Sequence, residues 1–255
     1  MAALAPMAAK AADMPQYTPP PVVTAVPLWD WSGFYLGLNA GYGWGQNGGA
    51  NMSFTDPGAA FFGPCLVAGS CVGGLSYDTD GFVGGAQAGY NWQINQFVLG
   101  IEADIEYSDM NGGAGFASFV PPFAAGSFTS TSEINWLATL RGRLGVAVDR
   151  TLIYATGGLA AGGVDDNFRW GYPTINQVYV GDGSDTEWGW VVGAGLEYAM
   201  TDNFILGAEV LYFDLGSTSV PGVPVAGFIP PAGTSITANY DHDGVIARAR
   251  ASYKF

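Results

Sequence analysis

The chain alternates apolar residues with polar or small ones in eight segments, and each segment predicts a β-strand. In the first, Leu36 and Leu38 alternate with Gly37 and Asn39. Successive side chains of a strand point to opposite faces, so one face is apolar with aromatic ends and the other is small and polar. The predicted strands are 33–44, 82–93, 97–107, 135–146, 151–162, 188–198, 206–212 and 245–255. In 151–162 the pattern leaves the two faces unassigned.

The connections between these segments alternate between short and long. The short ones, around 94–96, 148–150 and 200–203, have the length of hairpin turns between antiparallel strands. The long ones, 45–80, 109–132, 163–186 and 214–240, are rich in Gly, Pro, Ser, Asn and Asp. The sequence therefore predicts short turns at one end of the strand array and four long loops at the other.

Composition decides where the apolar face points. Only 12% of the 255 residues are charged, against about 25% in ordinary globular domains. Glycine accounts for 39 of the 255 residues, about twice its usual share of about 7%. No apolar run reaches the roughly 18 residues of a membrane-spanning helix, but a closed β-barrel also pairs every backbone group in lipid. We predict an all-β, eight-stranded antiparallel up-and-down transmembrane β-barrel with short periplasmic turns and long extracellular loops. The alternative is a soluble β-sandwich or lipocalin-like barrel, in which the apolar face points inward.

Aromatic residues at the ends of the apolar faces support the membrane interpretation, because Trp and Tyr gather at membrane–water interfaces. The chain also stops in a strand with Tyr253 and Phe255 on one face. The expected interface aromatics are Phe34, Trp44, Tyr90, Trp92, Trp188, Tyr198, Tyr253 and Phe255.

The polar faces predict an ion-pair network inside the barrel. Acidic residues of one strand neighbour arginines of the next, and charges away from water must be paired. The expected members are Glu102, Asp104, Glu106, Arg141, Arg143, Glu197, Glu209, Arg248 and Arg250. One interpretation is a plug that closes the lumen, and the other is a constricted, charge-lined pore. An eight-stranded barrel is just wide enough for side chains to fill, which favours the plug.

The net charge of −14, from 22 acidic and 8 basic residues, excludes nucleic acid as a partner. Twelve carboxylates lie on the long connections or within three residues of them, against the one cation Arg169. They could recruit divalent cations and bridge to anionic lipid headgroups, or they could form a solvated, repulsive surface. Since no segment has EF-hand spacing, we expect no bound metal and no cofactor. The carboxylates are those of Asp56, Asp78, Asp80, Asp109, Asp165, Asp166, Asp182, Asp185, Glu187, Asp214, Asp241 and Asp243.

The N-terminus is typical of an exported protein. Ala9-Lys10-Ala11 has the A-x-A pattern of a cleavage site, so we interpret 1–11 as the remnant of an export signal, 12–30 as a proline-rich periplasmic segment and 31–255 as the barrel. The alternative for the first residues is a disordered tail. In an exported protein Cys65 and Cys71 are expected to form a disulfide, and two thiols are too few for a structural zinc site.

Catalysis has one candidate, the lone His242 between Asp241 and Asp243. A histidine with a carboxylate partner could act as a general base. Neighbours in a strand point to opposite faces, however, and no G-x-S-x-G serine accompanies it. We therefore expect a loop histidine and no enzymatic activity.

Several motifs together resemble the small eight-stranded outer-membrane proteins known as outer-membrane immunogenic or porin-family proteins. They are residues 31–37 (WSGFYLG), 39–44 (NAGYGW), 84–92 (GGAQAGYNW), 154–160 (YATGGLA), Gly189-Trp190, 193–197 (GAGLE) and 253–255 (YKF). The resemblance implies a barrel in the outer membrane of a Gram-negative bacterium. It also implies insertion by the assembly machinery that reads the terminal aromatic, here Phe255, and it brings no catalytic residues.

From these observations we expect a structural and surface-display role, with a small diffusion channel as the alternative. The expected partners are outer-membrane lipid and lipopolysaccharide, and the sequence leaves the extracellular partner open.

Overall fold

The computed structural model describes residues 29–46, 49–58, 62, 73–118, 126–172 and 176–255. Its long strands are β1 (Gly33–Gln46), β4 (Asp80–Ile94), β5 (Phe97–Ser118), β6 (Gly126–Val148), β7 (Thr151–Tyr172), β8 (Gln177–Ala199), β9 (Phe204–Pro221) and β11 (Ser235–Lys254). Three short strands are β2 (Gly49–Thr55), β3 (Gly74–Ser76) and β10 (Val223–Pro224). In this part of the chain no helix is long and apolar enough to cross a membrane.

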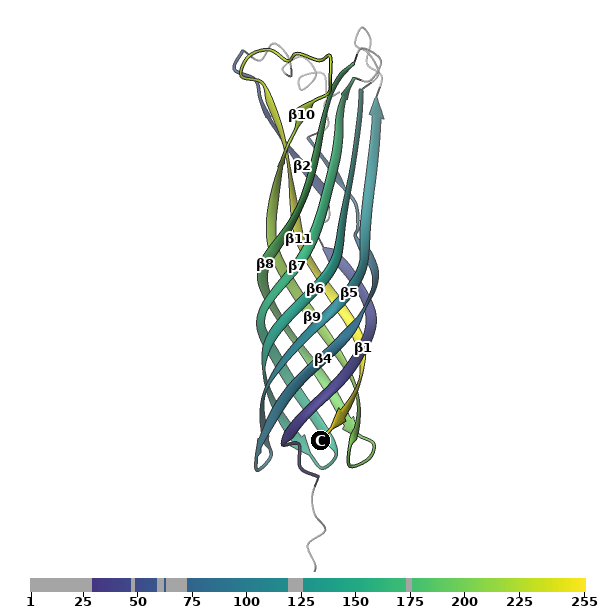
Figure 1. Ribbon diagram of the computed structural model, residues 1–255, viewed down its shortest axis with the longest axis vertical. Helices are drawn as coiled ribbons and strands as arrows, with labels where there is room; N and C mark the ends of the chain where they lie inside the picture. Colours follow the sequence, from purple (N-terminus) through teal and green to yellow (C-terminus); the bar gives the residue numbers. More distant parts are fainter. Residues whose placement is uncertain (1–28, 47–48, 59–61, 63–72, 119–125, 173–175) are drawn as a thin grey trace, which may run out of the picture.

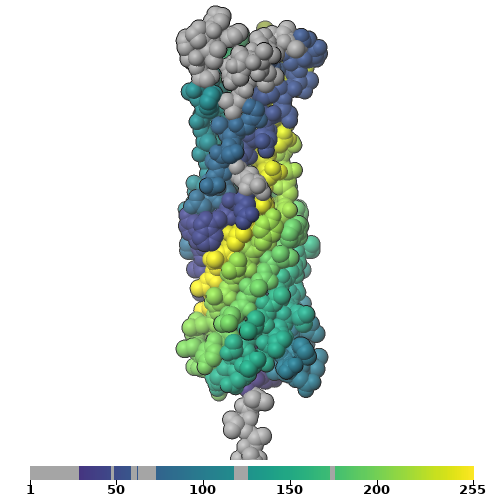
Figure 2. All heavy atoms as spheres, turned by 180° about the vertical axis from the view of Figure 1, so that it is seen from behind, coloured from purple at the N-terminus to yellow at the C-terminus, as the bar shows by residue number. Residues whose placement is uncertain are grey.

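The long strands form a closed ring in the order β1-β4-β5-β6-β7-β8-β9-β11, and every neighbouring pair is antiparallel. β1 also pairs with β11, from Tyr35 opposite Lys254 to Gln46 opposite Asp243, which closes the ring. Figure 1 shows the tilted strands wound around one axis. In Figure 2 the yellow end of the chain lies beside its purple beginning, where the ring closes. The predicted eight-stranded antiparallel barrel is confirmed.

Short turns and the chain's last residue lie together at one end of the ring, here called the turn end (Figure 1). Asn95 and Asp149, with φ of 58° and 54°, occupy the left-handed region in the β4–β5 and β6–β7 turns. Asn and Asp tolerate this region best among residues with a side chain, and tight hairpins require it. The opposite end of the ring is called the far end.

The long connections at the far end are mostly strand, so their prediction as loops is wrong over much of their length. β5 continues to Ser118 and β6 begins at Gly126, both inside the predicted connection 109–132. β2 pairs with the outer part of β11, where Asn51 lies opposite Asn239. Outside a membrane both faces of a hairpin accept polar residues, so the alternation that marks a strand fades while backbone pairing continues.

The apolar faces point outward. Leu38 is 67% exposed and Leu140 is 58% exposed, whereas Arg141 is 1% exposed. The soluble alternative requires the reverse arrangement and is therefore excluded. In 151–162, where the sequence left the faces open, Leu152 and Tyr154 point inward.

All eight expected interface aromatics lie on the outer surface, with exposed fractions of 37% to 72%. On β1, Phe34 and Trp44 are ten residues apart. At about 3.4 Å per residue and a strand tilt of about 40°, they bound a band roughly 25 Å tall, the height of the apolar band of a transmembrane barrel.

Candidate functional site in the barrel interior

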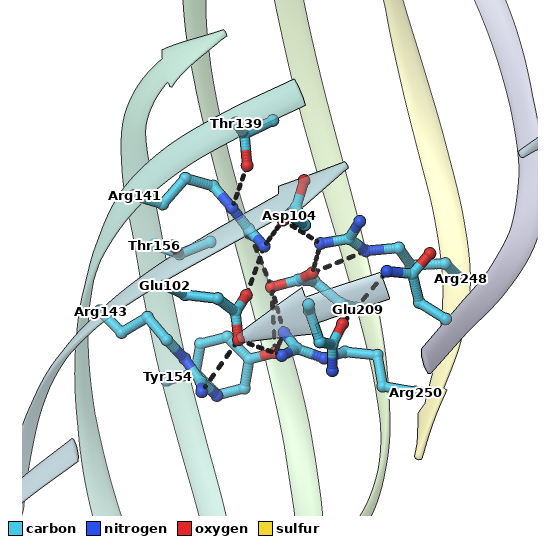
Figure 3. Close-up of polar contacts among 12 residues, drawn as sticks. Glu102, Asp104, Thr139, Arg141, Arg143, Tyr154, Thr156, Glu209, Arg248 and Arg250 are labelled. Atoms are coloured by element: carbon cyan, nitrogen blue, oxygen red, sulfur yellow. Dashed lines mark hydrogen bonds and ion pairs between the residues drawn. The ribbon is translucent and has the colours of Figure 1, made fainter. Parts of the chain in front are cut away.

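Five carboxylates and four guanidinium groups meet inside the barrel, at the level drawn in Figure 3, and are here called the ionic layer. No side chain among them is more than 4% exposed. The structure thus brings together all nine residues expected there. β5 provides Glu102, Asp104 and Glu106, β6 provides Arg141 and Arg143, β8 provides Glu197, β9 provides Glu209, and β11 provides Arg248 and Arg250.

Arg141 connects opposite walls of the barrel. Its Nη2 lies 2.7 Å from Asp104 Oδ2 on the neighbouring β5, and its Nη1 lies 2.9 Å from Glu209 Oε1 on β9. Its Nε donates to Thr139 Oγ1 at 2.9 Å. The planar guanidinium fork suits such contacts with several carboxylates, because its donors point in fixed directions. Arg141 therefore fixes the distance between two strands that are not neighbours in the ring.

Arg248 contacts three carboxylates, two of which it shares with Arg141. Its Nη2 lies 2.6 Å from Glu209 Oε2 and 3.2 Å from Asp104 Oδ2, and its Nη1 pairs with Glu106. Arg143 Nη2 lies 2.7 Å from Glu197 Oε1. Because arginines from two strands share carboxylates from three others, removing any one member leaves the buried charges that it contacts with fewer partners.

Two tyrosines that the sequence analysis missed complete this ionic layer. Tyr35 donates to Glu102 Oε2 at 2.6 Å, and Tyr154 donates to Glu209 Oε1 at 3.0 Å. Both rings are 3% exposed. Each hydroxyl thus adds a hydrogen bond to a buried carboxylate that arginines already contact. Tyr35 carried a usable signal, because it is an aromatic residue on a polar face.

Apolar layers lie above and below the ionic layer. Beyond Arg248 along β11 comes buried Ile246, and beyond Arg141 along β6 comes buried Leu137. They belong to a middle apolar layer with Val83, Met110, Ile134, Ala160, Val164, Val191, Leu211, Phe213 and Leu215. On the other side of the ionic layer, Trp31, Val98, Leu152, Tyr154, Ala199 and Ile205 form a turn-end apolar layer. The charged groups are thus enclosed between two apolar layers.

Trp31 closes the turn end. Its ring is 1% exposed and meets the Trp29 ring edge-on at 5.9 Å. Trp31 N donates to Gln93 Oε1 at 2.7 Å, and Gln93 N donates to Ser32 Oγ at 2.9 Å. Gly33 follows with φ of 134°, a conformation that favours glycine. The Trp-Ser-Gly sequence thereby turns the chain across the barrel mouth before β1 begins.

A second polar group lies beyond the middle apolar layer and was not predicted. His242, expected in a loop, is part of β11 and only 3% exposed, so that expectation is wrong. Its Nε2 lies 3.1 Å from Oδ2 of Asp166, which is 1% exposed rather than part of a solvated surface. The flanking aspartates do not supply this partner, since a strand alternates its side chains and β7 provides the carboxylate from across the lumen.

Hydroxyl groups lie next to His242 and Asp166 toward the far end, and together these residues are here called the polar belt. Tyr77 and Tyr240 lie 3.2 and 3.0 Å from Ser130 Oγ, and the Tyr240 hydroxyl donates to Asn167 O at 3.2 Å. Beyond it lies a far-end aromatic core. Its buried members are Ala50, Met52, Phe62, Phe128, Phe168, Trp170, Tyr179, Val220, Ile236, Ala238 and Tyr240.

Several expectations fall on residues that the structure does not describe. Cys65 and Cys71, residues 1–11 and nearly all of the proline-rich segment lie outside the described residues. Among the described residues no group of three or more His, Cys, Asp or Glu side chains is arranged to hold a metal ion.

A family model described as an outer membrane protein β-barrel domain matches residues 2–255. The chain belongs to this family. The 31 kDa outer-membrane immunogenic protein of Brucella melitensis is 37% identical over 227 residues, which cover 88% of each protein. The 22 kDa outer membrane protein of Rhizobium leguminosarum is 30% identical over 194 residues, covering 75% of this chain and 67% of that protein.

Among solved structures, OprG from Pseudomonas aeruginosa has a TM-score of 0.51 at 12% identity, covering 88% of this chain and 96% of that one. This likeness concerns the fold alone. Together, the family and the outward apolar band make the chain an integral protein of the outer membrane of Gram-negative bacteria. In such barrels the short turns face the periplasm, so the far end is extracellular.

Proposed function

We propose that this outer-membrane barrel is a non-conducting structural protein that displays its extracellular hairpins, rather than an open channel or an enzyme. The observation that supports this most strongly is the order of the interior: turn-end apolar layer, ionic layer, middle apolar layer, polar belt and far-end aromatic core. An ion would have to cross at least two dry layers as well as the paired charges, and burial of an unpaired charge is costly.

Planar-bilayer recording tests the closed lumen directly. The full-length protein is expected to show no steady conductance. If a conductance is seen, the double variant Arg141→Gln and Arg143→Gln shows its route. Neutralising the two arginines alters ion selectivity only if ions pass between them. A steady, selective conductance that these changes modify would replace the proposal with the diffusion channel.

A second candidate, a rim enzyme, is favoured only by the His242–Asp166 contact. His242 Nδ1 has no hydrogen-bond partner among the described residues, so no serine, threonine or cysteine is placed there as an activated nucleophile. We propose a structural role for this pair. Hydrolysis by the purified protein that disappears on His242→Ala would contradict it.

We also propose partners for the periplasmic end and for the outward faces of the barrel. Phe255 is 67% exposed at the periplasmic rim, where its N donates to Phe34 O at 3.0 Å. This exposed terminal ring is available to the barrel assembly machinery. Outer-membrane lipid and lipopolysaccharide would surround the outward faces. Deleting Phe255 should slow assembly into membranes, and it leaves all residues of the ionic layer in place.

A further inference from the structure

The strands continue beyond the membrane band at the far end, and this part is here called the extracellular extension. A hollow of about 320 Å³ lies on its outer wall. Its outward side chains form two rows across three neighbouring strands, because the residues are paired in register. The first row is Thr129, Arg169 and Val180, and the second is Thr131, Asn167 and Asp182. The hollow therefore presents a guanidinium group, an amide, two hydroxyls and a carboxylate on one surface.

Arg169 differs from the other arginines of the described chain. Four of them are paired inside the ionic layer, and Arg150 lies 3.1 Å from Asp202 at the periplasmic end. Arg169 is exposed and forms no ion pair with any described residue. Among the described residues it is also the one lysine or arginine on the extracellular side. Its guanidinium group is free to bind an anion from outside.

The position of the hollow limits what that anion can be. Trp188, which is 72% exposed, lies opposite Ala161 and marks the outer edge of the apolar band. Asn167 and Asp182 pair six residues farther along the same two strands. At about 3.3 Å per residue and a tilt of about 40°, the hollow lies roughly 15 Å above that edge. This is the height of sugars attached to lipids of the outer leaflet.

We propose that the hollow binds a phosphorylated sugar of the lipopolysaccharide in its own membrane. Arg169 binds the phosphate through its guanidinium fork, which matches phosphate geometry. Thr129, Thr131 and Asn167 hydrogen-bond to sugar hydroxyls. Asp182 accepts from another hydroxyl, so these hydrogen bonds favour a phosphate that is joined to a sugar over a free one. The proposal requires the membrane placement and is independent of whether the lumen conducts.

The test measures binding of purified lipopolysaccharide to the full-length protein in phosphatidylcholine nanodiscs, with dephosphorylated lipopolysaccharide and inorganic phosphate as separate probes. Arg169→Gln is expected to weaken binding of intact lipopolysaccharide about tenfold or more, and to leave binding of the dephosphorylated form unchanged. Arg150→Gln is the matched control and should bind like the wild type. Inorganic phosphate alone should bind much more weakly than lipopolysaccharide.

A second variant, Thr129→Val with Thr131→Val, retains Arg169 and removes two hydroxyls, so it should weaken binding of both lipopolysaccharide forms. Folding of each variant is verified by compact gel mobility before heating. Equal binding of intact lipopolysaccharide by Arg169→Gln and wild type would overturn the proposal. So would an equal loss in Arg150→Gln, or competition by inorganic phosphate at the same concentration as lipopolysaccharide, which would indicate a simple anion site.

Discussion

His242 Nε2 on β11 lies 3.1 Å from Asp166 Oδ2 on β7, and two strands, β8 and β9, separate β7 from β11 in the ring. The pair therefore crosses the lumen, as Arg141 does in the ionic layer. Cross-lumen contacts at two heights therefore hold the walls together, those of the ionic layer within the membrane band and the His242–Asp166 contact outside it.

Removing the outer of these contacts should loosen the extracellular extension alone. His242→Ala leaves the buried Asp166 carboxylate without its partner, at a cost of about 1–3 kcal/mol. Hydrogen exchange should accelerate in the extracellular parts of β7 and β11 and stay unchanged around Arg141. Asp241→Asn, at the exposed neighbouring position, is the control and should leave exchange as it is. Uniform acceleration along both strands would show that the pair does not act locally.

Loss of Arg141 should destabilise the whole barrel. Arg141→Ala leaves Glu102, Asp104 and Glu209 with fewer cations in a dry interior, and breaking such a buried set costs about 3–5 kcal/mol. Urea unfolding from lipid vesicles, followed by tryptophan fluorescence, measures the change. Arg150→Ala removes a rim arginine with an exposed partner and should cost less than about 1 kcal/mol. Similar losses in the two variants would contradict a special role for the ionic layer.

Trp31 should act as the periplasmic seal. Trp31→Ala opens a cavity in the turn-end apolar layer, and truncation of a buried tryptophan costs about 3–5 kcal/mol. The variant should unfold at lower urea concentration and admit a water-soluble quencher to the tyrosines below. Trp188→Ala, which truncates an exposed ring, controls for the loss of a tryptophan as such. Unchanged quencher access in Trp31→Ala would mean that the ionic layer alone closes the lumen.

The tyrosines of the polar belt should make the extension sensitive to alkali. Burial raises the pKa of Tyr77 to about 12 and also raises that of Tyr240, whereas unfolded tyrosine titrates near 10. The folded extension thus binds these protons more tightly, so its extra stability is complete below about pH 10 and is lost as the pH rises toward 12. Ultraviolet absorption of tyrosinate against pH should show a late component that Tyr77→Phe reduces. Titration of every tyrosine near pH 10 would contradict this assignment.

The alternation of side chains was enough to predict the ring and the ionic layer, because lipid outside and paired charges inside impose opposite chemistry on the two faces. It left 151–162 unassigned because Leu152 and Ile153 are both apolar, one buried inward and the other facing lipid. In the outer parts of β5 and β6 this contrast is lost, because the glycines of 112–115 and the Ser/Thr run 129–132 put small or polar residues on both faces, so the extension of these two strands could not be predicted from the pattern. His242 and Asp166 were missed because their contact joins residues 76 apart in sequence.

The two faces of each extracellular hairpin are under separate constraints. Inward positions such as Phe168 must fit a packed core, whereas outward neighbours such as Arg169 touch no other layer of the protein. Substitutions can therefore accumulate on alternate residues of β6, β7 and β8 without disturbing the scaffold. A cell could change what its surface presents to antibodies while keeping the same barrel beneath it.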